Sequence, residues 1–133
     1  MACRHSDTAA ALGTTAQIAR AVEMLRLSSN HDKRLWLNRL LAMPCKADDA
    51  CRMQTVCAHA YDEHLKAFDM IESARHRMDQ AEFDASAQDA SAEAMLGAAA
   101  LAQRAQRLLK ESRRLTRDCA ENEAVIRQRY RLR

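Results

Sequence analysis

Two long amphipathic helical patterns constrain this chain more than any other feature. The first runs over residues 49–80 and the second over 92–130, and both carry apolar residues at three-and-four spacing. Residues 84–93 lie between them and contain no large apolar side chain. We therefore predict that the chain reverses near Gln88 and that the two patterns form a long antiparallel helical hairpin. In this hairpin, residues whose numbers add up to 176 lie at one level.

The charge distribution favours the same fold-back. Residues 49–100 carry four basic and ten acidic side chains, whereas residues 101–133 carry ten basic and four acidic ones. Each exposed ion pair contributes only about 0–1 kcal/mol, but several together select a register. The predicted cross-helix pairs are Asp62–Arg114, Glu63–Arg113, Asp69–Arg107 and Glu72–Arg104.

The rest of the chain predicts two shorter helices. With 2 Gly and 1 Pro in 133 residues, the chain has almost nothing to turn a sheet, so we expect an all-α protein. A capping-box pattern at Thr14 opens a helix over about 15–27, and Ser29 precedes another over about 31–43. We expect an elongated bundle in which these two helices cover the hairpin, with a thin core because aromatic residues make up only 4%. Residues 1–13 are predicted to be a tether or a frayed lead-in, and residues 14–133 a single helical domain.

The five cysteines are the strongest chemical signal. The hairpin register places Cys57 beside Cys119, and Cys45 and Cys51 close a short loop after Pro44. We therefore predict two disulfides, Cys57–Cys119 and Cys45–Cys51, which in the chain-entropy model contribute about 4 and about 2 kcal/mol. The alternative is that all five cysteines are reduced and act as small buried residues in a cytosolic protein.

The fifth cysteine, Cys3, follows a small residue close to the start of the chain. This is the pattern left when a bacterial lipoprotein leader is removed and a start Met is added, so Cys3 is a candidate lipid anchor. A natural start with an incidental cysteine explains the pattern equally well. No stretch approaches the ~18–20 apolar residues of a membrane span.

The helix predicted over 31–43 is unusually apolar. Its large side chains cover more than half of its circumference. They pack on two sides as a central helix, or they leave a docking surface for a protein partner or a second copy of the chain. The residues concerned are Leu35, Trp36, Leu37, Leu40 and Leu41.

A basic stripe follows the second long helix, formed by Arg107, Lys110, Arg114 and Arg117. It is a solvated face paired with the acidic helix, or it contacts anionic lipid headgroups or an acidic partner. The arginine-rich tail around Tyr130 is a second such patch. We do not expect nucleic-acid binding, because the net charge of +3 is the remainder of larger opposed blocks.

No residue pattern indicates catalysis, so we do not expect an enzyme or a cofactor. The spacing of Cys45, Cys51 and Cys57 is too wide for a zinc site, and both glycines are isolated, which excludes a phosphate loop. The histidine on the hairpin seam, His64, is expected to be a core residue bonded to Ser112.

The cysteine series 45, 51, 57 and 119, with Cys3 and the ending Cys-x5-Val-Ile-Arg-Gln-Arg-Tyr, resembles small exported bacterial helical proteins and lipoproteins. The chain is similar in kind to the helical pilotin lipoproteins that escort secretins, although no residue motif matches. The resemblance implies a non-enzymatic binding or scaffold protein of the cell envelope, in the periplasm or at the outer membrane. The alternative is a cytosolic coiled-coil adaptor or secretion chaperone with reduced thiols.

Overall fold

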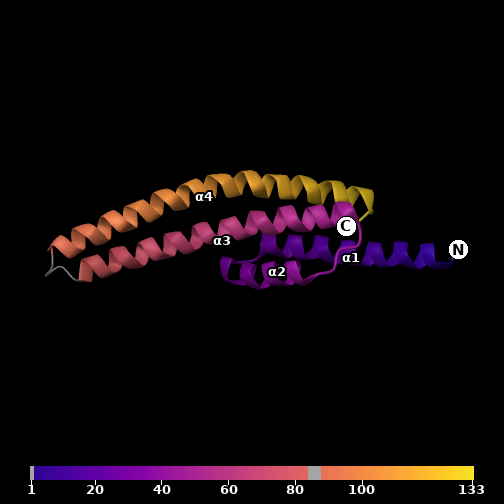
Figure 1. The fold of residues 1–133 in the computed structure, drawn as a ribbon, viewed down its shortest axis with the longest axis horizontal. Helices are drawn as coiled ribbons and strands as arrows, with labels where there is room; N and C mark the ends of the chain where they lie inside the picture. Colours follow the sequence, from indigo (N-terminus) through magenta and orange to yellow (C-terminus); the bar gives the residue numbers. More distant parts are fainter. Residues whose placement is uncertain (1, 84–87) are drawn as a thin grey trace. The chain divides into compact units, whose positions relative to one another are not determined.

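The computed structural model describes residues 2–83 and 88–133, and it describes side-chain surroundings for residues 8–82 and 92–133. Within these residues it contains four α-helices and no strand, which confirms the all-α prediction. The helices are α1 (Ala2–Leu27), α2 (Asn30–Ala42), α3 (Asp48–Phe83) and α4 (Gln88–Arg129) (Figure 1).

The predicted helical hairpin is present. Figure 1 shows α3 and α4 running side by side in opposite directions. Cys57 of α3 and Cys119 of α4 form a disulfide with their Cα atoms 4.7 Å apart, so the predicted register holds at this level. The reversal itself was predicted near Gln88, which begins α4, and residues 84–87 lie outside the described residues.

Backbone packing divides the chain into two compact units. Unit 1 comprises Met1–Asp62 and Arg113–Arg133, and unit 2 comprises Glu63–Ser112. Unit 1 therefore contains α1, α2, the start of α3 and the end of α4, whereas unit 2 contains only two helical segments. A single domain over 14–133 stays a prediction.

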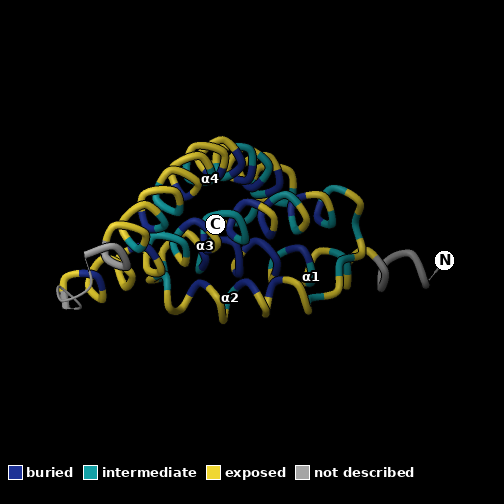
Figure 2. The backbone as a smooth tube through the Cα atoms, turned by 60° about the vertical axis from the view of Figure 1, so that its left-hand side comes forward, coloured by how far each residue is buried: buried dark blue, intermediate teal, exposed yellow. Residues whose placement is uncertain are grey.

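All four helices contribute large side chains to the core of unit 1. Figure 2 shows α2 exposed along its outer side and buried along the side that faces the other helices of this unit. Both disulfides lie in unit 1, and Cys57 and Cys119 are themselves buried. The largest fully buried side chains here are Ile18, Val22, Leu25, Leu40 and Met53.

The core of unit 2 consists mainly of alanine. Its buried positions recur at helical spacing along the two segments, and in the described part of this unit Leu65 is the one large aliphatic side chain among them. Alanine buries little area, so the apolar contribution to stability in this unit is small. Among the residues of unit 2 whose side-chain surroundings are described (63–82 and 92–112), the other buried ones are Ala67, Ala74, Ala81, Ala98, Ala105 and Ser112.

The first helix is longer than the sequence predicts. It begins at Ala2, so residues 2–13 are helical where a tether was expected. The hydroxyl of Thr14 donates to the carbonyl of Ala11 at 3.1 Å, so this residue lies inside the helix and the capping-box prediction is wrong. By contrast, Ser29 caps α2 as predicted, because its hydroxyl accepts a hydrogen bond from the backbone N–H of Asp32 at 3.3 Å.

Candidate functional site

The apolar surface of α2 is divided between core and solvent. Leu37 and Leu40 are 7% and 0% exposed, so they belong to the core and not to the predicted partner surface. Leu35 and Leu41 remain 49% and 62% exposed. Trp36 is half-buried, and the Arg39 guanidinium lies over its ring at 4.7 Å from the centroid. The part of the predicted surface that stays accessible therefore centres on Leu35 and Leu41.

Leu41 forms one wall of a groove between α2 and α3. The groove has a volume of about 460 Å³. Its floor includes the buried Ala58, and its rim carries an amide, a hydroxyl, an imidazole and a carboxylate. This combination of an apolar wall and a few polar groups is typical of binding sites. The lining residues are Leu41, Gln54, Thr55, Ala58, His59 and Asp62.

Two local restraints hold the walls of this groove together. The Gln54 side-chain amide donates to the carbonyls of Leu40 and Met43 at 2.7 and 2.8 Å, which ties the end of α2 to α3. The Cys45–Cys51 disulfide, with Cα atoms 5.3 Å apart, joins the connecting segment to the first turns of α3. The groove is therefore preorganised, which reduces the ordering cost of binding.

The other end of α2 is anchored by Lys33. Its ammonium donates to the carbonyls of Leu25 and Ser28, both at 2.6 Å, and lies 5.8 Å from the centre of the Tyr61 ring. Leu25 lies in the last turn of α1, where carbonyls lack helical partners, and Ser28 directly follows that helix. Burial lowers the pKa of Lys33. The whole of α2 is thus held at both ends by polar contacts that the apolar pattern alone did not reveal.

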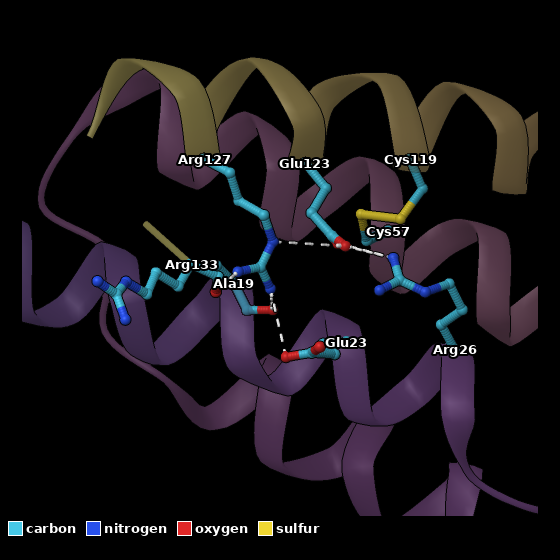
Figure 3. A network of polar contacts seen from close by, with 8 residues as sticks. All are labelled: Ala19, Glu23, Arg26, Cys57, Cys119, Glu123, Arg127 and Arg133. Carbon is cyan, nitrogen blue, oxygen red and sulfur yellow. Dashed lines mark hydrogen bonds and ion pairs between the residues drawn. A yellow bond between two sulfur atoms is a disulfide. The ribbon is translucent and has the colours of Figure 1, made fainter. Parts of the chain in front are cut away.

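A buried carboxylate joins α1 to α4 (Figure 3). Glu123 is 3% exposed, and both of its oxygens accept hydrogen bonds from the Arg26 guanidinium. Arg127 lies 3.8 Å from the same carboxylate, and it donates to the Ala19 carbonyl at 3.2 Å and to the Arg133 carbonyl at 2.6 Å. Sequence reasoning missed this network, although Glu123 lies one helical turn from Cys119 on the buried seam.

The C-terminal arginines are therefore not all available as the predicted anionic-partner patch. Besides Arg127, Arg129 donates to the Asp49 carboxylate at 2.6 Å, and the Tyr130 hydroxyl donates to the same carboxylate at 3.0 Å. These contacts clamp the end of α4 onto the start of α3. Partial burial acts to raise the pKa of Asp49, but the hydrogen bonds from Arg129, Tyr130 and the Ala50 N–H outweigh it and hold that pKa below its ordinary value.

The predicted cross-helix ion pairs are partly replaced by pairs within one helix. Glu63 pairs with Lys66, and Glu72 pairs with Arg75, each at 3.4 Å. A salt-bridge partner three residues away lies on the same helix, so the pair forms wherever the second helix is placed. This explains why the observed pairs differ from the predicted ones. The basic stripe of Arg107, Lys110, Arg114 and Arg117 is exposed throughout, and Arg114 lies 3.6 Å from Asp118.

Both predicted disulfides are present, which indicates an oxidising setting outside the cytosol. Cys3 belongs to α1, but its side chain lies outside those whose surroundings are described. No helix in the described part of the chain is both long and apolar enough to cross a bilayer. Among the same residues, no three His, Cys, Asp or Glu side chains gather as metal ligands would.

No protein-family model, no curated protein and no solved structure matches this chain.

Proposed function

We propose that this chain is a non-enzymatic binding protein of the bacterial cell envelope, and that the groove between α2 and α3 takes a helical segment of a protein partner. The observation that carries the proposal is the exposure of Leu41 beside a groove whose floor is apolar and whose rim is polar. An amphipathic helix presents one or two apolar side chains to such a groove, and its polar flanks meet the rim.

The disulfides support the envelope part of the proposal. An oxidising compartment keeps Cys45–Cys51 and Cys57–Cys119 closed, and the first of these holds the groove. In a bacterium this compartment is the periplasm or the periphery of the outer membrane. A lipid on Cys3 would anchor the chain there, and we keep Cys3 as the candidate anchor.

Counting thiols under denaturing conditions tests the compartment. The chain has five cysteines and four of them are paired, so the exported protein should show one free thiol, or none if Cys3 is lipidated. Five free thiols in protein isolated from its native cells would instead support the cytosolic adaptor or chaperone, and would exclude the envelope proposal.

Site-specific crosslinking tests the groove. A photoreactive residue in place of the exposed Thr55, inside the groove, should give one defined adduct in the envelope, whereas the same residue at Asn38 on the outer side of α2 should not. The partner identified by the adduct is then purified and titrated. Leu41→Asp should weaken its binding about ten- to hundredfold, because a leucine loses its apolar burial.

The matched control is Leu27→Asp. Leu27 is 70% exposed and lies at the end of α1, outside the groove. The control therefore makes the same replacement of an exposed leucine by aspartate at a site that does not line the groove. Equal weakening by Leu27→Asp and Leu41→Asp would show that the groove is not the contact, and would overturn the proposal.

A further inference from the structure

An exposed apolar face lies on α4 within unit 2. Leu96 is 72% exposed, although it lies on a helix whose other side is buried against α3 through Ala98 and Ala105. Ala92 and Ala100 are exposed on the same side as Leu96, whereas Met95 lies toward α3 and lines a small pocket with Met78 and Ala81. Exposed apolar residues that gather on one helix face mark an interaction site more often than scattered ones do.

The charges along this face change sign from one end to the other. Glu93 lies at its N-terminal end, whereas Arg104 and Arg107 lie at its C-terminal end, and all three side chains are exposed. Within the described part of the chain, none of them forms an ion pair with another side chain. A face with this order of charge is complementary to a copy of itself laid in the opposite direction.

We propose that two copies of the chain pair antiparallel through this face, with a two-fold axis at Ala100. Glu93 and Arg107 each lie seven residues from Ala100, which is two helical turns and about 10.5 Å along the axis. Both are therefore on the same side of α4 as Ala100. In the antiparallel pair, Glu93 of one copy is level with Arg107 of the other, and this ion pair occurs twice.

The apolar residues fit the same arrangement. Leu96 of one copy is level with Arg104 of the other, so it packs along the aliphatic stem of that arginine, and the small Ala100 side chains at the axis let the two helices approach. A parallel pair would instead place Glu93 beside Glu93 and Arg107 beside Arg107, so repulsion between like charges excludes it. This pairing uses a surface separate from the groove and does not depend on the partner proposed there.

The contact is small, so the dimer should be weak and sensitive to salt. About eight residues on each copy take part, against roughly 20–30 a side in a standard interface. Sedimentation equilibrium over a range of protein concentrations should show a monomer–dimer equilibrium that shifts toward monomer as ionic strength rises. A chain that stays monomeric at every concentration would overturn the proposal.

Cysteine crosslinking locates the axis. In a Cys3→Ser background, Ala100→Cys should form a dimer on mild oxidation, because the two introduced thiols meet at the axis. The control is Gln106→Cys, which is exposed on the same helix but points about 120° away from Ala100. Equal crosslinking at the two positions would mean random collision and would overturn the proposal.

Charge reversal tests the ion pairs in the otherwise intact chain. Arg107→Glu should raise the dimer dissociation constant roughly tenfold, because it replaces two attractive pairs by two repulsive ones. The double variant Glu93→Arg/Arg107→Glu should restore the original value. Arg117→Glu, an exposed change on the same helix outside this face, should leave it unchanged. Failure of the double variant to restore pairing would overturn the assignment.

Discussion

Glu123 is the most deeply buried charged residue in the part of the chain whose side-chain surroundings are described. Its carboxylate is 3% exposed and is compensated by Arg26 and Arg127 from two different helices. We expect Glu123→Ala to lower the free energy of unfolding by about 2–4 kcal/mol, because Arg26 loses its carboxylate partner and the largely buried Arg127 keeps only Glu23 as a carboxylate partner, at 3.5 Å. Denaturant unfolding followed by circular dichroism measures this change.

The control for Glu123 is Arg114→Ala. This residue pairs with Asp118, but the two side chains are 59% and 45% exposed, so the loss should stay below about 0.5 kcal/mol. A Glu123→Ala variant that unfolds at the same denaturant concentration as Arg114→Ala would show that the buried network adds nothing to stability.

Gly13 offers the opposite kind of change. It lies inside α1, and a Cβ added there would meet no atom within 4 Å. Gly13→Ala should therefore raise the free energy of unfolding by up to about 1 kcal/mol, because alanine loses less backbone entropy in a helix. In Gly97→Ala the new Cβ would lie 3.2 Å from an Arg77 nitrogen, so the gain should be smaller. Thermal unfolding of both variants ranks them, and a destabilised Gly13→Ala would contradict the open surroundings.

Residue-level predictions from the sequence succeeded where one helix decides the outcome. Ser29 caps α2 because its partner lies three residues ahead. They left the outcome open where a second helix decides. Leu37 and Leu40 were expected either in a buried central helix or on a docking surface, and the packing of α2 buries them. The groove beside Leu41 was missed for the same reason, because no pattern in the sequence gives the position of α2 on α3.

At the scale of elements, the hairpin could be predicted because several signals share one register. The apolar seam, the charge blocks and the Cys57–Cys119 pair all require the same fold-back, and only the disulfide needs close geometry. The start of α1 could not be predicted, because Gly13 and the capping-box pattern at Thr14 are both typical of a helix end. The helix continues through them, since the surrounding alanines are strong helix formers and Thr14 bonds back to Ala11.

The clamp between α3 and α4 predicts a pH dependence. The folded-state pKa of Asp49 lies below its ordinary value of 3.8, so its contribution is present above pH 3.8 and is lost as the pH falls through the folded value. We expect Asp49→Asn to be less stable than the wild type above pH 5, by at most about 1 kcal/mol because the pair is partly exposed. The difference should shrink toward pH 2.

The matched control for the clamp is Asp48→Asn. Asp48 is exposed in the same first turn of α3, so it changes the helix-end charge without touching Arg129 or Tyr130. Thermal unfolding midpoints between pH 2 and pH 6 compare the three proteins. If the midpoints of the wild type and Asp49→Asn change in parallel with pH, protonation of Asp49 does not contribute to the pH dependence of stability.

On the scale of the whole molecule, the two units differ in how they are stabilised. Unit 1 packs large side chains from four helices and contains both disulfides. Unit 2 buries mainly alanine between two helical segments. Composition predicted a thin core, but it could not show that the thin part is confined to Glu63–Ser112, because that depends on which stretch α1 and α2 cover.

Hydrogen exchange should reveal this difference. Local opening is easier where few apolar contacts are lost, so amides of α3 in unit 2 should exchange at least about tenfold faster than amides of the same helix in unit 1. Both sets of amides belong to α3, so the comparison does not involve two different helices. Mass spectrometry of peptides on either side of Asp62 measures the exchange rates. Both peptides lie away from the ends of α3, so fraying does not contribute. Equal protection on the two sides would mean that the chain opens as one cooperative body, and the alanine core would then be sufficient for its stability.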